Sequence, residues 1–150
     1  MTPQNLIHKV DFEFATIPAM KGNLMGNGYR DLRVWQQSVQ LTLDVYKAVE
    51  RFPKKEQYQL ISQICRAAVS IPSNIAEGKG RHTPKELVQF LHHSRGSLYE
   101  LETQLLIANK LGYIDSEVTI SLQKNCEEIG RALNGLIHAV QGKTRPDPEV

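Results

Sequence analysis

The feature that most constrains this chain is a hydrophobic repeat in which apolar residues recur in steps of three and four. The repeat occurs in four segments of about 22–28 residues, and no segment shows the two-residue alternation of a β-strand. Steps of three and four place apolar side chains along one side of an α-helix, where they pack against other helices. Because the connections are short, sequential helices should be antiparallel. The sequence therefore predicts an all-α fold, an antiparallel up-down-up-down four-helix bundle.

The segments run from Asp31 to Phe52, from Glu56 to Lys79, from Thr83 to a stop at Gly112, and from Asp115 to Gly142. The residues expected to face the core are, in chain order, Leu32, Trp35, Val39, Thr42, Tyr46, Val49; Ile61, Ile64, Ala68, Ile71, Ile75; Leu87, Leu91, Ser94, Leu98, Leu101, Leu105, Ala108; and Leu122, Cys126, Ile129, Leu133, Leu136, Val140. Further apolar residues lie beside these positions: Leu41, Val45, Leu60, Val69, Phe90, Tyr99, Leu106 and Ile137. They either widen the core or form a second buried surface through which copies of the chain associate.

Pro72 lies within the second segment, yet the apolar spacing continues from Ile71 to Ile75. Proline removes the donor that would bond the Ala68 carbonyl, so the pattern predicts one helix kinked at Pro72. We expect Ser70, Ser73 and Asn74 to satisfy the freed backbone groups. The third segment opens with Thr83, Pro84 and Glu86, which predict a capping box with proline in the first helical position.

The ends of the chain lack this periodicity. Prolines and glycines interrupt residues 1–28, and prolines interrupt residues 142–150, so we expect a flexible extension, a bundle over residues 29–141 and a flexible tail. Cys65 and Cys126 match no metal-binding spacing, and no secretory signal opens the chain, which predicts a reducing, cytoplasmic setting. No run of about 18 apolar residues occurs, so no membrane partner is expected.

Charge is unevenly distributed, although the whole chain carries only +2. Residues 66–95 have a net charge of +3 and residues 96–130 a net charge of −4. The cations of the basic stretch are Arg66, Lys79, Arg81, Lys85 and Arg95. A basic face on helices two and three would bind RNA, DNA or a ribonucleoprotein through phosphates. Two solvated faces and a scaffold that binds a protein partner are the alternatives.

Three stretches of sequence resemble a known family. SIPSNIAEGKGR at residues 70–81, KELVQFLHHSRGSLYELETQLLIANKLGY at residues 85–113, and YRDLRVWQQSVQLTLDVYK at residues 29–47 are similar to the bacterial 23S rRNA intervening-sequence protein family. The resemblance implies a four-helix bundle that assembles as a homopentamer. Some members are encoded within inserts in 23S rRNA genes, and distant relatives are accessory proteins of diversity-generating retroelements, which bind a reverse transcriptase and nucleic acid.

The resemblance supplies no catalytic residues, and it implies a non-enzymatic protein. It does single out a set of motif residues: Ser73, Asn74, Glu77, Gly78, Glu100 and Glu102. Our hypothesis is that they form a polar network or a subunit contact.

Several chemistries find no support in the sequence. No Glu is followed three residues later by His, so a di-iron centre of the ferritin type is not expected, and neither is any other metal or cofactor. No phosphate-binding loop of the Gly-x-x-x-x-Gly-Lys type occurs. Arg131 and His138 are spaced as in the motif of HEPN ribonucleases, where Arg holds a phosphate and His moves a proton. A HEPN-like ribonuclease is therefore a further hypothesis. It ranks third because one such match is expected by chance.

Overall fold

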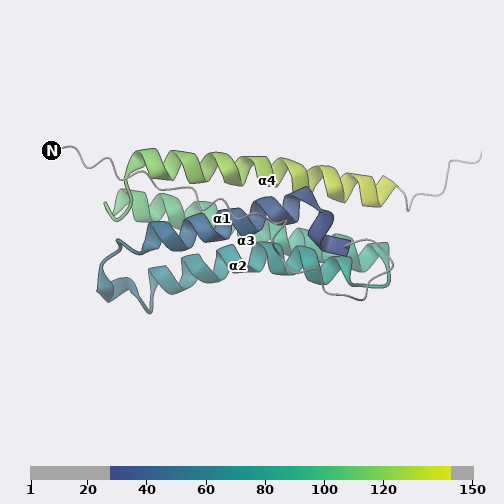
Figure 1. Cartoon of the computed structure of the whole chain (residues 1–150), viewed down its shortest axis with the longest axis horizontal. Coiled ribbons are helices and arrows are strands. Elements are labelled where there is room, and N and C mark those ends of the chain that lie inside the picture. Colours follow the sequence, from purple (N-terminus) through teal and green to yellow (C-terminus); the bar gives the residue numbers. More distant parts are fainter. Residues whose placement is uncertain (1–27, 143–150) are drawn as a thin grey trace, which may run out of the picture.

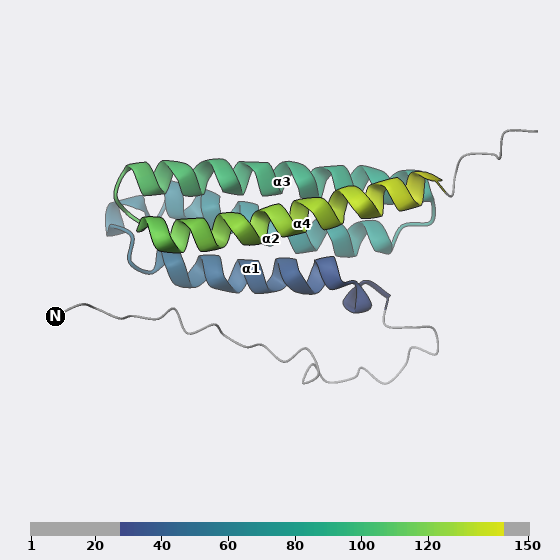
Figure 2. The same ribbon diagram turned by 90° about the horizontal axis from the view of Figure 1, so that it is seen from above.

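The computed structural model describes residues 28–142, which form four α-helices and two short 3-10 turns. The helices are α1 (Arg33–Val49), α2 (Leu60–Lys79), α3 (Pro84–Lys110) and α4 (Ser116–Gly142), and the 3-10 turns are η2 (Gly28–Asp31) and η3 (Lys54–Glu56). Figures 1 and 2 show each helix running back alongside the one before it, so the chain crosses the molecule four times. The prediction of an all-α four-helix bundle is confirmed. The expected flexible extension and tail lie outside the described residues, except at their inner edges.

Each helix packs against two neighbours, in the cyclic order α1, α2, α3, α4. The predicted core positions of α3 are buried from Leu91 to Ala108, as are most of those of α2 and α4. The prediction for α1 is wrong by about one residue step, or 100° of helix rotation, from Trp35 to Tyr46, and it is confirmed at Val49. Its buried residues are Val34, Ser38, Leu41, Val45 and Val49.

The misplaced residues of α1 lie instead along its border with α2 and at its start. Trp35 packs edge-on against Tyr29, with 5.2 Å between ring centroids. Tyr46 is 48% exposed, and Thr42 is half-buried. The apolar stripe of α1 is wide, and the spacing of three and four can be traced along its edge as easily as along its centre. The residues beside the predicted stripes divide accordingly: Leu41, Val45 and Ile137 are buried, whereas Val69, Tyr99 and Leu106 are exposed.

The ends of the helices follow the local sequence signals closely. The hydroxyl of Thr83 accepts from the Glu86 amide, and the Glu86 carboxylate accepts from the Thr83 amide, which confirms the capping box. Gly112 has a φ of +78°, and the amide of Tyr113 donates to the Ala108 carbonyl at 3.0 Å, which closes α3 with a Schellman motif. The second helix starts at Leu60, four residues after the predicted start at Glu56, because Glu56 ends the 3-10 turn η3 and residues 57–59 form a further turn.

Helix α2 continues without interruption through Pro72, which is buried. The Ala68 carbonyl, deprived of its helix donor, lies 3.0 Å from the Thr42 hydroxyl of α1. That hydroxyl also lies 2.8 Å from the Ser38 carbonyl, so it shares one proton between two acceptors. The expectation that nearby Ser and Asn side chains satisfy this carbonyl is wrong, because the donor comes from the neighbouring helix. A kink at Pro72 stays a prediction.

Small residues bring α2 and α3 together. A Cβ atom added to Gly78 would lie 2.6 Å from the Cβ of Phe90, so only glycine permits this approach. Further along the same contact, the hydroxyls of Ser70 and Ser97 lie 2.8 Å apart, and the Ser94 hydroxyl donates to the Ile71 carbonyl at 2.9 Å. These contacts explain why the α2–α3 pair is the most extensive in the bundle.

Candidate functional site: the basic half of the bundle

The charges of the folded chain separate along the length of the bundle. The Ser70–Ser97 contact marks the middle of α2 and α3, and the bundle divides there into two halves. The basic half comprises residues 28–40, 70–97 and 129–142, and it holds seven Lys and Arg against three Asp and Glu, a net charge of +4. The acidic half comprises residues 41–69 and 98–128, and it holds seven Lys and Arg against nine Asp and Glu, a net charge of −2. The two ends therefore present opposite potentials to a charged ligand.

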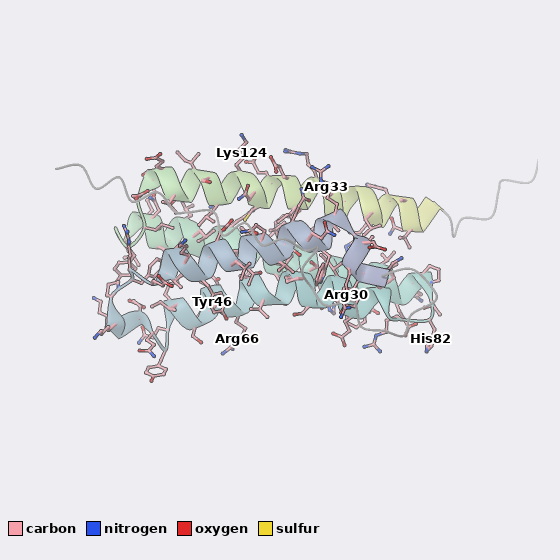
Figure 3. All side chains as sticks on the ribbon, in the orientation of Figure 1. Arg30, Arg33, Tyr46, Arg66, His82 and Lys124 are labelled. Atoms are coloured by element: carbon pink, nitrogen blue, oxygen red, sulfur yellow. The ribbon has the colours of Figure 1, made fainter. Side chains whose placement is uncertain are left out.

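The basic half includes the start of α1, the turn between α2 and α3, and the end of α4 (Figure 1). Its cations are Arg30, Arg33, Lys79, Arg81, Lys85, Arg95 and Arg131. Four histidines lie in the same half: His82, His92, His93 and His138. Figure 3 shows Arg30, Arg33 and His82 in this half, with Lys124 and Tyr46 in the other.

Three of the predicted nucleic-acid-binding residues gather at the α2–α3 turn. Lys79, Arg81 and Lys85 are all exposed there. Arg81 pairs with Glu77 at 2.9 Å and lies over the Phe90 ring, 4.7 Å from its centroid. Lys79 and Lys85 form no ion pair within the described part of the chain. The two lysines therefore offer charges that no neighbouring carboxylate neutralises directly.

The other two predicted residues lie elsewhere. Arg66 projects from α2 toward solvent (Figure 3), about 20 Å along the helix from Lys79 at 1.5 Å per residue, and falls in the acidic half. Arg95 faces the neighbouring helix α4, where its Nη1 atom donates to Asn134 Oδ1 at 2.9 Å. The five residues thus do not form one continuous face on helices two and three.

The contact of Arg95 with α4 belongs to a second group of polar side chains. Arg95 Nη2 lies 3.0 Å from His92 Nδ1. Arginine can only donate, so Nδ1 of His92 accepts, and the proton of the neutral ring lies on Nε2. Arg131 and His138 are exposed and lie two turns apart on one face of α4, on either side of Asn134.

The motif residues of the segment after Ser70 have separate structural roles. Asn74 Nδ2 donates to the Ser70 carbonyl at 2.8 Å, and the Ser70 hydroxyl in turn contacts Ser97. Ser73 bonds back to the Val69 carbonyl and is exposed. Gly78 allows the close approach to Phe90, and Glu77 is exposed beside Arg81. A subunit contact through the six motif residues stays a prediction.

Glu100 and Glu102 do not join that segment in a network. Glu100 is exposed and accepts from the Gln104 side chain at 3.1 Å. Glu102 is half-buried on the side facing α4, where burial and the charge of Glu127 raise the pKa of its carboxyl. Among the described residues, the six motif positions therefore form separate pairs instead of one network.

The cysteines behave as small apolar residues. Cys126 is buried, and burial raises the pKa of its thiol to about 12. Burial also raises the pKa of Cys65. A thiol with such a pKa is protonated near neutral pH and is a poor nucleophile. Within residues 28–142, no group of three or more His, Cys, Asp and Glu is arranged to hold a metal ion, and no helix there is long and apolar enough to cross a bilayer.

Sequence reasoning missed Arg30, Arg33 and Arg131 as members of the basic half. The first two precede or open α1, and Arg131 lies almost forty residues beyond the basic stretch. Their grouping depends on the lengths and directions of the four helices. A signal was available in α4, since residues 129–142 contain no Asp or Glu.

Comparisons with known proteins agree with this fold. The profile of the 23S rRNA-intervening sequence protein family matches residues 30–135. Among solved structures, a protein with unknown function from the S23 ribosomal protein family of Bacteroides thetaiotaomicron VPI-5482 superposes with a TM-score of 0.63. The two are 22% identical, and the match covers 69% of this chain and 97% of that chain. At this identity the likeness shows the fold alone. No curated protein matches the sequence.

Proposed function

This chain belongs to the 23S rRNA-intervening sequence protein family, and we propose that it is a non-enzymatic bundle that binds RNA through its basic half. The observation that carries the proposal is the separation of charge, with seven cations against three carboxylates in one half of a chain that is nearly neutral overall. Phosphate contacts supply most of the affinity of proteins that bind nucleic acid without reading sequence. Lys79 and Lys85 are exposed and unpaired, so they are available for such contacts.

Self-association would strengthen this binding. We propose that the chain forms a homopentamer in the cytoplasm, so that five basic halves act on one RNA. Three side chains that a monomer leaves in water support a further interface: Tyr99 at 51% exposed, Leu106 at 51% and Val69 at 41%. Light scattering should give a mass near five times 17.0 kDa, and a monomer would remove the contribution of avidity.

Fluorescence anisotropy with a labelled 23S rRNA fragment tests the proposed activity. Affinity should fall steeply between about 50 mM and about 200 mM salt, because phosphate binding releases counterions. Replacing Lys79 and Lys85 together by alanine should weaken binding and reduce the slope of log K against log[salt] by about 1.5. The matched control replaces Lys54 and Lys55, which are equally exposed in the acidic half, and should leave affinity unchanged. Equal effects of the two double variants would contradict the proposal, and duplex DNA of the same length shows which nucleic acid is preferred.

A protein-binding scaffold is the second candidate, because exposed apolar side chains gather in the acidic half. They are Tyr46, Tyr58, Val69, Tyr99, Leu106, Ile107, Leu111 and Ile120. A reverse transcriptase or another protein could occupy that region. An unchanged mass in the presence of RNA at low salt would favour this candidate.

The ribonuclease hypothesis has its own test. Arg131 and His138 are exposed and share a face of α4. Cleavage of RNA by the purified protein that disappears with His138→Ala would overturn the non-enzymatic proposal.

A further inference from the structure

The strip of surface where α3 and α4 meet within the basic half is rich in donors and cations, and the one carboxylate in these parts of α3 and α4 is that of Glu86, which accepts from the Thr83 amide and hydroxyl. Residues 87–99 of α3 and residues 129–142 of α4 contain no Asp or Glu. The polar side chains of this strip are Lys85, His92, Arg95, Arg131, Asn134 and His138, which we call the α3/α4 donor surface. At its outer end, Pro84, Lys85, Val88 and Gln141 line a groove of about 310 Å³.

Hydrogen bonds already made by this surface use its acceptors and leave donors without a partner among the described residues. Arg95 uses one N–H on Asn134 Oδ1 and one on His92 Nδ1, so three of its five N–H groups remain for another acceptor. Asn134 spends its carbonyl oxygen on Arg95, which leaves the two N–H groups of its amide. Because Nδ1 of His92 accepts from Arg95, its Nε2–H group is a donor directed away from that contact.

The pairing of α3 with α4 brings the remaining members alongside. Arg95 contacts Asn134, and Gln123 donates to the Glu102 carbonyl at 3.0 Å, which fixes the antiparallel register of the two helices. One turn from Arg95 toward the basic end lies His92, and one turn from Asn134 in the same direction lies His138. The two steps move along the bundle by about 4.5 Å and about 6 Å, so the two histidines lie at nearly the same level.

We propose that the α3/α4 donor surface holds a phosphodiester group of the RNA strand, with Arg95 and Arg131 as its main charged contacts. This inference rests on the proposed function and locates its contact. A phosphodiester carries a negative charge and oxygen acceptors but no strong donor, which complements a surface of cations and N–H groups. Arg95 is held in place before the ligand arrives, so less side-chain entropy is lost on binding.

Single substitutions on one face of α4 test the location. Arg131 and Lys124 are both exposed cations of α4, and they lie seven residues apart on the same face. Figure 3 shows Lys124 in the acidic half. Arg131→Gln should weaken binding of a labelled 23S rRNA fragment about tenfold and reduce the salt slope by about 0.8. His138→Gln should weaken it severalfold, and Lys124→Gln should change neither quantity.

Each outcome is decisive. Equal losses for Arg131→Gln and Lys124→Gln, or no loss for Arg131→Gln and His138→Gln, overturn the location. If Lys79→Ala, which lies outside the α3/α4 donor surface, still weakens binding in that case, the proposed function stands and only this inference fails. If the unaltered protein does not bind at about 50 mM salt, both fall. Circular dichroism and unfolding temperature confirm that each variant is folded.

Discussion

Replacing Gly78 by alanine tests whether the close approach of α2 and α3 depends on a missing side chain. The added Cβ would lie 2.6 Å from Phe90 Cβ, 3.2 Å from Leu87 Cδ1 and 3.3 Å from the Leu87 carbonyl oxygen. The Phe90 atom is attached to the backbone of α3, so it cannot move away by a change of rotamer. The helices must separate or shift, and overpacking of this kind costs about 1–3 kcal/mol.

Helix propensity opposes part of this cost. Alanine is favoured over glycine by about 1 kcal/mol inside a helix, and by less at Gly78, which is the next-to-last residue of α2. We therefore expect a net loss of about 1–2 kcal/mol, or a fall of about 4–8 °C in unfolding temperature. The matched control is Gly96→Ala in α3, where an added Cβ meets nothing within 4 Å. The free energy of unfolding of that variant should rise by about 1 kcal/mol, because alanine has the higher helix propensity and its side chain meets no neighbour.

Urea unfolding at a fixed protein concentration measures the free energy of unfolding of both variants. Substitutions of Phe90 then test whether its Cβ is the obstructing atom. Phe90→Ala keeps the Cβ and should not relieve the contact in a double variant with Gly78→Ala. Phe90→Gly removes the Cβ and should show a favourable coupling of about 1 kcal/mol in a double-mutant cycle. The reasoning is refuted if Gly78→Ala leaves stability unchanged or raises it while Gly96→Ala behaves as expected.

Three further predictions follow from single contacts. Thr42→Val removes the hydroxyl that lies 3.0 Å from the Ala68 carbonyl and should lower stability by about 1–2 kcal/mol in urea unfolding, whereas Thr42→Ser should cost less than half as much. Burial and the charge of Glu127 raise the pKa of Glu102, so the folded state favours the protonated carboxyl. Ionisation of this carboxyl therefore lowers the free energy of unfolding above the raised pKa. Below the ordinary pKa of a glutamate the carboxyl is protonated in both states, and the free energy of unfolding is unaffected. Glu102→Gln should therefore raise the unfolding temperature by about 1–3 °C at neutral pH and leave it unchanged in scans below about pH 4, and the same gain at both pH values would contradict the assignment. Since the pKa of Cys126 is about 12 and the thiol is buried, iodoacetamide at pH 8 should label it only at the rate of unfolding, as mass spectrometry of timed samples would show.

The extent to which the fold could be predicted differs from helix to helix. In α3 the spacing from Leu91 to Ala108 identified the core correctly, although the helix also carries apolar residues that are exposed, Tyr99, Leu106 and Ile107. In α1 apolar side chains cover a wider arc, and spacing alone could not distinguish Leu41 and Val45 from Thr42 and Tyr46. Packing against α2 and α4 determines which of these residues are buried. The donor to the Ala68 carbonyl was missed for a related reason, because the sequence around Pro72 contains no information about the helix beside it.

The candidate site was less predictable than the fold. The cluster of Lys79, Arg81 and Lys85 is local in sequence, and its position at a turn followed from the capping box at Thr83. Arg66 and Arg95 lie on helices whose rotation about their own axes the sequence did not fix, so grouping them with the turn was an assumption. The pairing of Arg95 with Asn134 joins residues that are 39 positions apart, and no spacing rule links them.

The separation of charge is concentrated in the α3–α4 pair, and it depends on the register of these two helices. Residues 98–128 carry six Asp and Glu against two Lys, whereas the remaining parts of α3 and α4 carry three Lys and Arg against Glu86 alone. The sign changes between Arg95 and Glu100 in α3, and again after Glu128 in α4.

These two changes of sign lie level with one another because Arg95 meets Asn134 while Gln123 meets the Glu102 carbonyl. Sliding α4 by two turns toward the acidic half would bring Arg131 beside Glu102 and mix the signs. The register is held by apolar packing, since Ile129 and Leu133 are buried at the level of the boundary. The same core contacts that stabilise the bundle therefore keep its cations together at one end, where their fields add instead of cancelling.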